Sequence, residues 1–493
     1  MAVRHLIRRQ VGRVAALTLI LAGIGFGVDP PKVQAAPVTS TILAQATAAE
    51  LMARYWTTSP VSCSSGSGTF GPDLIGDGTC SWWQAAVDQS AVESYEQATG
   101  DTSYDSDIEN TYSKWHGKDY SRLPDFGAYY FDDTAWWGLA WLQAYLLTGN
   151  PSYEFVAEND AAYIYKNGWD YGSAGYADGE GTKAQDDPSA CGGGTGGVWW
   201  GYAPSGHPAI TTNSSSLDHI VFNSNGKYAG RNAITNELFL ELTAWLYNVT
   251  GNRSYLSEAE SEWSWFQRSG LLITSGNSTY VADGYGGAGD GSTCEYETGS
   301  NPQAPTFTYS QGVVLAGLAQ LYRATNNHRL LSTAEKIADT ELRSAASSAS
   351  PDYQYGVLQE WCQACAANTQ GNANTAFKGI FVSGLKTLAA IAGTARYNGF
   401  FQVQASSIED ADTNSSNLNG MLWDQPPPNP CPLKDTASDA DSPADNSCSA
   451  ATQASALDGL VAAQGTPDGR LFLRRDDVCR IMTFCPRGVF CGR

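Results

Sequence analysis

Asp132 and Asp133 are adjacent acids in one of the most aromatic stretches of this 493-residue chain, and they are its best candidates for chemistry. Residues 129–131 are Tyr, Tyr and Phe, and Trp136 and Trp137 follow the pair. Sugar cleavage needs one carboxyl group to protonate the departing glycosidic oxygen and another to attack or stabilise the anomeric carbon. Aromatic rings hold a pyranose by stacking. The pair therefore predicts a carbohydrate-cleaving site.

An alternative interpretation is that the two acids only start a helix, because Asp is a favoured N-cap and its charge complements the helix dipole. The residues from Trp137 to Leu147 put apolar side chains on one helical face, so the acids would lie at the mouth of a well-anchored helix. The other Asp-Asp pairs, 186–187 and 476–477, have no Trp pair beside them. The two interpretations are compatible.

Repeated turn segments indicate that helical hairpins position the two acids. Residues 98–104, 147–153 and 249–255 share one pattern, and residues 324–327 are a looser copy. Each follows an apolar-periodic stretch, and its Gly, or Asn326 in the looser copy, can adopt the left-handed conformation that ends a helix. The polar residues after it then begin the next helix, which makes an αα-hairpin.

Helices predominate, since extended alternation of apolar and polar residues is scarce. One helix has Leu238, Leu242, Trp245, Leu246 and Val249 on a single face. Helical hairpins over some 350 residues, linked by Gly-rich segments, predict an all-α toroid with long loops over one rim. An α-solenoid would give a similar pattern.

Composition divides the chain into three parts. Residues 1–35 are typical of a secretory signal peptide, with arginines, an apolar run and small residues in that order. Residues 36–405 form the predicted catalytic domain. From residue 406 the chain is rich in Ser, Asp, Asn and Pro and then turns basic, so we predict that residues 406–493 are a linker and a disordered tail containing Cys.

The formal charge of −21 disfavours nucleic acid and anionic membranes as partners and suits an uncharged polysaccharide. The C-terminus has no hydrophobic tail for a lipid anchor. We expect a monomer without a membrane anchor, secreted to the extracellular space or associated with the cell wall. Five Asn-x-Ser/Thr sequons would mark glycosylated loops in a secreted eukaryotic protein, and they lie at Asn213, Asn248, Asn252, Asn277 and Asn414.

The eleven cysteines fit an oxidising compartment, with several disulfides of undetermined pairing and at least one cysteine left over. Cys362 and Cys365 have the spacing of a zinc or redox pair, but no second Cys pair or His cluster accompanies them. Residues 283–295 lack the spacing of an EF-hand loop. We therefore expect neither a metal nor a cofactor.

Several segments together resemble glycoside hydrolase family 76, which comprises α-1,6-mannanases and related fungal wall transglycosylases. Their order and spacing fit over about residues 50 to 400. The segments are Cys80-Ser81-Trp82-Trp83-Gln84-Ala85, Thr99-Gly100-Asp101-Thr102-Ser103-Tyr104, Phe131-Asp132-Asp133-Thr134-Ala135-Trp136-Trp137, Cys191-Gly192-Gly193-Gly194, Gly197-Val198-Trp199-Trp200, Asn232-Ala233-Ile234-Thr235-Asn236-Glu237-Leu238-Phe239, Thr308-Tyr309-Ser310-Gln311-Gly312 and Phe377-Lys378-Gly379-Ile380-Phe381.

The resemblance implies an (α/α)6 barrel and a retaining mechanism with Asp132 as nucleophile and Asp133 as general acid/base. Neighbouring residues can reach the carboxyl separation of ~5 to 5.5 Å that retention needs. Two carboxylates so close do not both ionise easily, which raises one pKa. Residues 195–197 stretch the usual spacing between the Gly-rich segment and the Trp pair, so the direction in which this loop points stays open.

The resemblance also implies substrate contacts, each with a structural alternative. Tryptophan rings would form sugar platforms or pack in the core. Asn236 and Lys378 would donate to sugar hydroxyls or belong to a buried network, and Asp283 would lie near the bound sugar or form an Asp-Gly turn. The tryptophans predicted to contact substrate are Trp82, Trp83, Trp136, Trp137, Trp199 and Trp200.

These observations predict a secreted endo-α-1,6-mannanase (mannan endo-1,6-α-mannosidase) that hydrolyses wall mannan with retention of configuration. One alternative is a wall transglycosylase that acts on mannose-containing anchor glycans and transfers the sugar to another sugar. The other is a carbohydrate-binding wall protein without turnover, although a binder gains little from two acids that repel each other.

Overall fold

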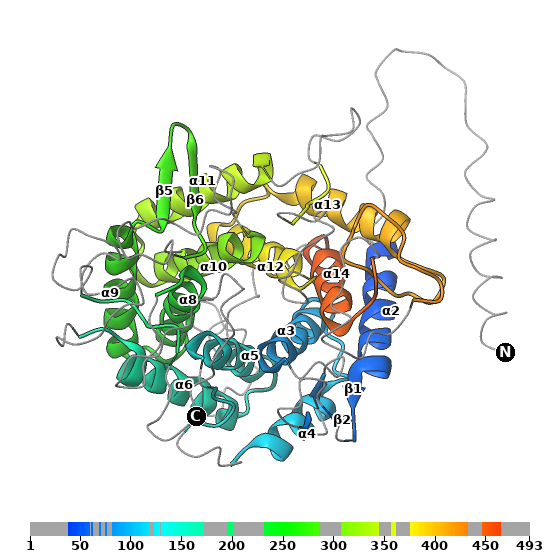
Figure 1. Ribbon diagram of the computed structural model, residues 1–493, viewed down its shortest axis with the longest axis horizontal. Helices are drawn as coiled ribbons and strands as arrows, with labels where there is room; N and C mark the ends of the chain where they lie inside the picture. Colours follow the sequence, from blue (N-terminus) through cyan, green and yellow to red (C-terminus); the bar gives the residue numbers. More distant parts are fainter. Residues whose placement is uncertain are drawn as a thin grey trace, which may run out of the picture. The chain divides into compact units, whose positions relative to one another are not determined.

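Two concentric layers of helices form the body of the protein in this computed structural model, which describes residues 38–59, 61–62, 69–70, 74–75, 81–117, 123–128, 130–171, 195–201, 231–284, 307–344, 356–360, 375–431 and 446–464. Residues 1–36 are a separate unit outside these ranges. Inner helices pack side by side in a closed ring, in which the last contacts the first (Figure 1). In ring order they are α3 (Trp82–Thr99), α5 (Phe131–Thr148), α8 (Ala233–Thr250), α10 (Thr308–Thr325), α12 (Phe377–Ala392) and α14 (Ala450–Ala462).

An outer helix precedes each inner helix in the chain, so the described helices alternate between the layers. This closed alternation confirms the predicted (α/α)6 toroid and excludes the solenoid, whose ends would not meet. The outer helices are α2 (Val38–Tyr55), α4 (Asp105–Trp115), α6 (Pro151–Gly168), α9 (Arg253–Ser269), α11 (His328–Ser344) and α13 (Asn398–Ser407), the last continued by the π-helical turn η3 (Ile408–Asp412).

Short pairs of β-strands lie in the connections between helices, and they do not form a larger sheet among the described residues. All three pairings are antiparallel, and the longest joins β5 to β6. The strands are β1 (Trp56–Thr57), β2 (Val61–Ser62), β3 (Thr69–Phe70), β4 (Leu74–Ile75), β5 (Leu272–Ser275) and β6 (Ser278–Val281).

The repeated turns end inner helices as the sequence predicts. Gly100, Gly149 and Gly251 have φ of 74°, 73° and 72°, and each backbone N–H donates to a carbonyl four residues earlier. Asn326 takes the same conformation at φ 56°. Connections from an inner to the next outer helix are therefore short, whereas those from an outer to the next inner helix are long. All long connections thus reach one rim, where the inner helices begin.

The predicted domain boundary at residue 405 is wrong. Helix α14 lies in the segment that composition assigned to a linker, yet it closes the ring between α12 and α3 and is almost wholly buried. Its helical stretch is rich in Ala and small polar residues, so apolar periodicity is weak although the helix is surrounded by protein. Residues 465–493 lie outside the described part of the chain.

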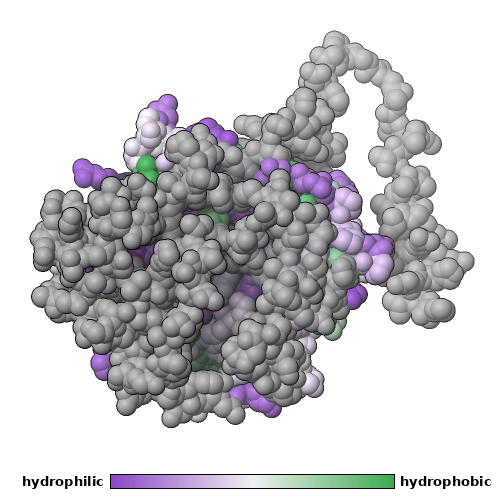
Figure 2. Space-filling model, viewed as in Figure 1, coloured by the Kyte–Doolittle hydropathy of each residue, from purple (hydrophilic) through white to green (hydrophobic). Residues whose placement is uncertain are grey.

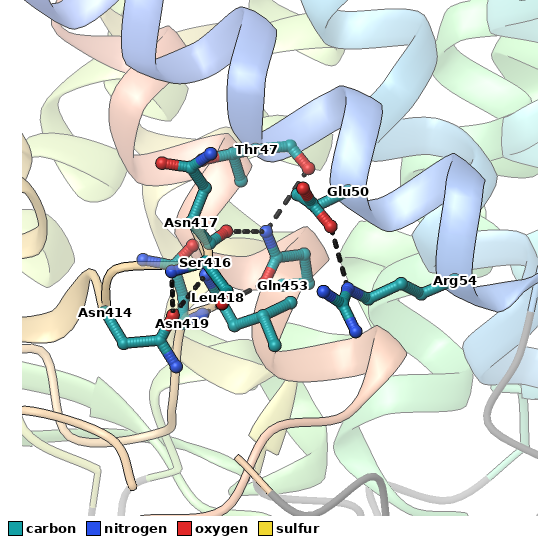
Figure 3. Close-up of polar contacts among 9 residues, drawn as sticks. All are labelled: Thr47, Glu50, Arg54, Asn414, Ser416, Asn417, Leu418, Asn419 and Gln453. Atoms are coloured by element: carbon teal, nitrogen blue, oxygen red, sulfur yellow. Dashed lines mark hydrogen bonds and ion pairs between the residues drawn. The ribbon is translucent and has the colours of Figure 1, made fainter. Parts of the chain in front are cut away.

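Polar side chains and a disulfide hold the described parts of the connection between α13 and α14, residues 413–431 and 446–449. The Gln453 side chain on α14 donates to the carbonyl oxygens of Thr47 on α2 (3.2 Å) and Asn417 (2.9 Å), and it accepts from the Asn419 N–H (3.0 Å) (Figure 3). Cys431 and Cys448 form a disulfide. The other nine cysteines, including Cys362 and Cys365, lie outside the described residues.

Helices α10 and α12 approach closely because glycines face each other. A Cβ on Gly384 would run into the carbonyl of Gly312, and one on Gly312 into the Phe381 backbone. We therefore expect Gly384→Ala to lower the free energy of unfolding by about 2 to 3 kcal/mol through overpacking. Gly100→Ala, which meets open space but retains a positive φ, should cost only about 1 kcal/mol. Urea unfolding of the two variants measures both, and the reverse order of losses would contradict this packing.

Candidate active site

Asp132 and Asp133 occupy the first turn of inner helix α5, at the rim reached by the long connections. The N-cap is Tyr130, in an extended conformation and without a side-chain cap hydrogen bond, so neither acid caps the helix. The α5 N-terminus carries partial positive charge, which favours a carboxylate there. Both residues are of intermediate burial.

Trp200 fixes the carboxyl group of Asp132. The Trp200 carbonyl accepts from the Phe131 N–H (2.8 Å), and Gly201 forms an antiparallel bridge with Tyr130. This pairing brings the Trp200 indole Nε1 to Asp132 Oδ2 (2.8 Å), while Asp132 Oδ1 accepts from the Asp133 N–H (3.0 Å). Among the described residues, by contrast, none donates a hydrogen bond to the Asp133 carboxyl group. The described residues therefore hold the Asp132 carboxyl group with two donors and leave that of Asp133 without one.

Asn236 anchors the segment that carries Trp200. Its Oδ1 accepts from the Val198 N–H (2.6 Å), and its Nδ2 donates to the carbonyls of Val198 (3.0 Å) and Asn232 (2.7 Å). The side chain is fully buried and both amide hydrogens are used. The prediction that Asn236 contacts a sugar is therefore wrong, and the buried-network alternative is correct.

Arg231 clamps the same segment from its other end, a role that the sequence analysis missed. Its guanidinium donates to the carbonyl of Gly196 (2.6 Å) and to Asp170 (3.2 Å), and it lies over the rings of Trp199 and Trp265. Trp199 is 3% exposed. Its predicted role as a sugar platform is wrong, since it lies beneath Arg231 in the core.

The remaining predicted tryptophans divide between core and rim. Trp137 is fully buried among Trp82, Phe126 and Trp141, so it has no face open to a sugar and that prediction is wrong. Trp82 packs against the same group and donates its indole N–H to the Phe126 carbonyl, which ties it to the core side. Trp82 itself is partly exposed, as are Trp83, Trp136 and Trp200.

An arc of aromatic rings crosses the rim between four inner helices. Trp83 on α3 contacts Trp136 on α5 and Phe377 on α12, with ring centroids 6.1 and 6.5 Å apart. Phe377 stacks on Tyr309 of α10 at 3.9 Å. Tyr309 and Phe377 belong to the motifs of the resemblance but were not predicted as site residues, because a single aromatic residue at a helix start does not distinguish core from site.

Asp283 lies at this rim, and its predicted contact with the sugar stays a prediction. Its carboxylate accepts from the Tyr309 hydroxyl (2.7 Å), and its carbonyl accepts from the Ala233 N–H at the start of α8 (2.8 Å). Lys378 does not belong to it. It is 1% exposed, donates to the Met421 carbonyl and lies 4.6 Å from the Trp423 ring, so the predicted sugar contact is wrong.

The surroundings of the two acids raise their pKa values above those of ordinary carboxyl groups. Burial raises the pKa of Asp132 to about 7, helped by the charge of Asp283 and opposed by the hydrogen bond from Trp200. Burial, and then the charge of Asp132, raises the pKa of Asp133 well above its usual range. The two groups titrate as a pair, in which ionised Asp132 beside protonated Asp133 is the arrangement that the hydrogen bonds favour.

The ring encloses a cavity of about 80 Å³ lined by all six inner helices, with Trp136 on its wall. Figure 2 shows that the centre of the ring is hollowed and that hydrophilic and neutral residues are visible inside it. Two acids line the cavity, Glu241 and Asp458, and burial raises the pKa of each to about 8. Lys386 lies near Asp458, and burial lowers its pKa to about 8.

Two substitutions should move the pH dependence of activity in opposite directions. Trp200→Phe removes a hydrogen bond that stabilises the Asp132 carboxylate, so its pKa and the ascending limb of kcat/KM should rise by about one pH unit. Asp283→Asn removes a nearby negative charge, so the same limb should move to lower pH. A pH profile of kcat/KM for each variant checks this, and a shift of both limbs in the same direction would contradict it.

A closed ring of helical hairpins with two adjacent acids and an aromatic arc at its long-loop rim has the architecture of helical-barrel glycoside hydrolases. The family model of glycosyl hydrolase family 76 matches residues 41–176 and 217–464, and the chain belongs to this family.

Curated fungal relatives match over shorter stretches. The chain is similar to mannan endo-1,6-alpha-mannosidase DCW1 of Candida albicans, with 36% identity over 22% of this chain and 22% of the relative. The protein of the same name from Saccharomyces cerevisiae is 25% identical over 41% of this chain and 40% of the relative. The matched regions thus span less than half the length of these relatives.

Solved structures match over most of the chain. An inactive variant of the α-1,6-mannanase GH76A of Salegentibacter sp. HEL1_6, in complex with α-1,6-mannotetrose, has a TM-score of 0.57 and 18% identity, covering 86% of this chain and 98% of that one. Dfg5 of Chaetomium thermophilum in complex with glucosamine has a TM-score of 0.60 and 18% identity, covering 87% and 91%. At this identity the matches show the fold. No helix among the described residues is long and apolar enough to cross a membrane.

Proposed function

We propose that this protein is a secreted endo-α-1,6-mannanase that hydrolyses the backbone of wall mannan with retention of configuration. The observation that carries the proposal is the unequal environment of the two adjacent acids. Asp132 is held by Trp200 and by a backbone N–H, whereas the carboxyl group of Asp133 receives no hydrogen bond from the described residues. This inequality suits two different roles in one reaction.

In the first step, Asp132 attacks the anomeric carbon while Asp133 gives its proton to the departing glycosidic oxygen. In the second step, water attacks the glycosyl-enzyme, and Asp133 takes a proton from that water, which restores both groups. The raised pKa of Asp133 keeps the proton available near neutral pH. Trp200 orients the nucleophile, and the α5 N-terminus stabilises its charge before attack.

Sugar binding is assigned to the partly exposed rings of the rim. Trp83 and Trp136 form one side of the arc, and the Tyr309 hydroxyl and Asp283 supply polar groups on the other. Rings bind the apolar faces of pyranoses and carboxylates accept from their hydroxyls. Trp200 contributes beside Asp132.

The relatives support both the substrate and the acids. The Salegentibacter variant is inactive with two consecutive aspartates replaced by alanine, and it holds an α-1,6-mannotetrose. The curated fungal relatives are named mannan endo-1,6-alpha-mannosidases. These names favour α-1,6-mannan as the substrate class of this chain.

Wall transglycosylation is the second candidate, because the structurally similar Dfg5 of Chaetomium thermophilum was solved with glucosamine, which is not a mannan unit. A sugar hydroxyl would then replace water in the second step and use the same two acids. Binding without turnover is the third outcome that an experiment must separate.

Incubation with unbranched α-1,6-mannan tests the proposal. We expect new reducing ends, internal cleavage products and an initial product with the α-anomeric configuration in NMR spectra. Products longer than the substrate would indicate that the protein is a transglycosylase and not a hydrolase. Binding of mannan without new reducing ends would indicate a carbohydrate-binding protein without activity. A first product with the β-anomeric configuration would refute the retaining mechanism.

A further inference from the structure

The sequons of this chain differ sharply in their surroundings, and the differences predict which of them can carry a glycan. Asn248, Asn252, Asn277 and Asn414 lie in the described part of the chain, whereas Asn213 lies outside it. An N-linked glycan occupies the side-chain nitrogen Nδ2. The question for each asparagine is therefore whether Nδ2 is accessible and whether it already serves the fold.

Asn277 is at the tip of the β5–β6 hairpin, directly after Gly276 at φ 59°. The residue is exposed, and its backbone carbonyl accepts a hydrogen bond from Arg343 (3.3 Å). No described residue bonds its side-chain amide. The hairpin projects from the ring beside outer helix α11, as Figure 1 shows. A glycan on Nδ2 would extend into solvent on the outer side of the ring.

Asn252 is the N-cap of outer helix α9, in the exposed turn after α8. Its Oδ1 accepts from the Ser254 N–H (3.1 Å), and Nδ2 bonds no described residue. A glycan would occupy only the nitrogen and leave Oδ1 to cap the helix. Modification and the cap are thus compatible.

Asn248 is one turn earlier, near the end of inner helix α8, and its nitrogen is engaged. Nδ2 donates to both the backbone carbonyl (2.9 Å) and the side-chain Oε1 (3.0 Å) of Gln320 on α10. A glycan would remove one of these N–H groups and wedge a sugar into the α8–α10 contact. Asn414 is also engaged, since it bonds the backbones of Pro428, Ser416 and Leu418 (Figure 3 draws the last two contacts).

We propose that Asn277 and Asn252 are N-glycosylation sites and that Asn248 and Asn414 stay unmodified in the folded protein. The donor is an oligosaccharide linked to a polyprenyl diphosphate. The bond between sugar C1 and the diphosphate oxygen breaks, a bond between C1 and Nδ2 forms, the nitrogen loses one proton, and the polyprenyl diphosphate leaves. The proposal rests on the expected secretion of the chain and is independent of its catalytic activity.

Glycopeptide mapping of the full chain expressed in a yeast host tests the assignment. Protein from the medium and from secretory membranes is treated with an amidase that releases N-glycans in heavy-oxygen water, which converts each glycosylated Asn into labelled Asp. We expect label at Asn277 and Asn252 and none at Asn248 or Asn414. Unlabelled Asn277, or labelled Asn248, in folded protein would overturn the proposal.

Two matched variants distinguish the loss of a glycan from the loss of a contact within the fold. Asn277→Gln should reduce the intact mass by one glycan and keep mannan cleavage unchanged, because the hairpin packs on outer helix α11. Asn248→Gln should leave the number of glycans unchanged and lower thermal stability through lost contacts to Gln320. An unchanged glycan number in Asn277→Gln would refute the site even if the enzyme is fully active. Inactive but glycosylated wild-type protein would refute only the proposed function.

Discussion

Asp132→Asn is expected to reduce kcat/KM on α-1,6-mannan by more than about four orders of magnitude, because the amide cannot attack the anomeric carbon. The fold should persist, since Asn has the shape of Asp and its side-chain oxygen can still accept the Trp200 N–H. Reducing-end assays and circular dichroism of the same preparation measure activity and folding. Near-normal turnover would remove Asp132 from the nucleophile assignment.

Asp133→Asn distinguishes the two roles. Loss of a general acid costs about two to four orders of magnitude when the leaving group needs a proton. An aryl α-mannoside with an acidic phenol leaves without protonation, so the first step of this variant should be almost normal and a glycosyl-enzyme should accumulate. Asp132→Asn should be inactive on both substrates. If Asp132→Asn instead accumulates the intermediate, the roles of the two acids are exchanged.

The sequence predicted the fold well because its signals are local. Gly100, Gly149, Gly251 and Asn326 end their helices for steric reasons that depend on a few neighbouring residues. Helix α14 was not predicted, because a helix enclosed on all sides has no polar face and therefore shows no alternation of polar and apolar residues with helical periodicity. The Ser-, Asp- and Pro-rich segment before it also resembles a linker.

The site was predicted less completely because burial depends on the tertiary structure. Adjacent acids beside Trp residues were visible in the sequence, but Trp136 and Trp137 differ only in which side of α5 they occupy. Trp136 is at the rim and Trp137 is in the core. Arg231 was not identified because its partners Asp170 and Gly196 are distant in sequence and no local pattern marks them.

Several acids besides Asp132 and Asp133 are buried without hydrogen-bond donors among the described residues. Asp160, Glu237 and Glu262 are 0% exposed, and no carboxyl oxygen of the three has a hydrogen-bond partner in the described part of the chain. Burial raises the pKa of each of them well above its usual range. Glu241 and Asp458 on the central cavity are raised to about 8. The folded protein therefore retains protons that the unfolded chain releases above about pH 4.

Thermal stability should consequently fall as the pH rises from about 5 to 8. A carboxyl group with a raised pKa in the folded state stabilises the fold fully below its unfolded pKa, and this contribution is lost as the pH rises towards its folded pKa. The loss is about 1.4 kcal/mol per pH unit for each such group. We expect Tm to drop by at least about 5 °C over this range. The lowered pKa values of Lys378 and Lys386, about 8, act in the opposite sense only above that pH.

Calorimetry of Asp160→Asn across the same pH range isolates one of these groups. The amide has no proton to lose, so the variant should lose less stability between pH 5 and 8 than the wild type. Glu260→Gln, on the exposed face of α9, serves as the control and should leave the slope unchanged. A wild-type Tm that rises from pH 5 to 8 would mean that these carboxyl groups are ionised in the fold, contrary to their burial without hydrogen-bond donors.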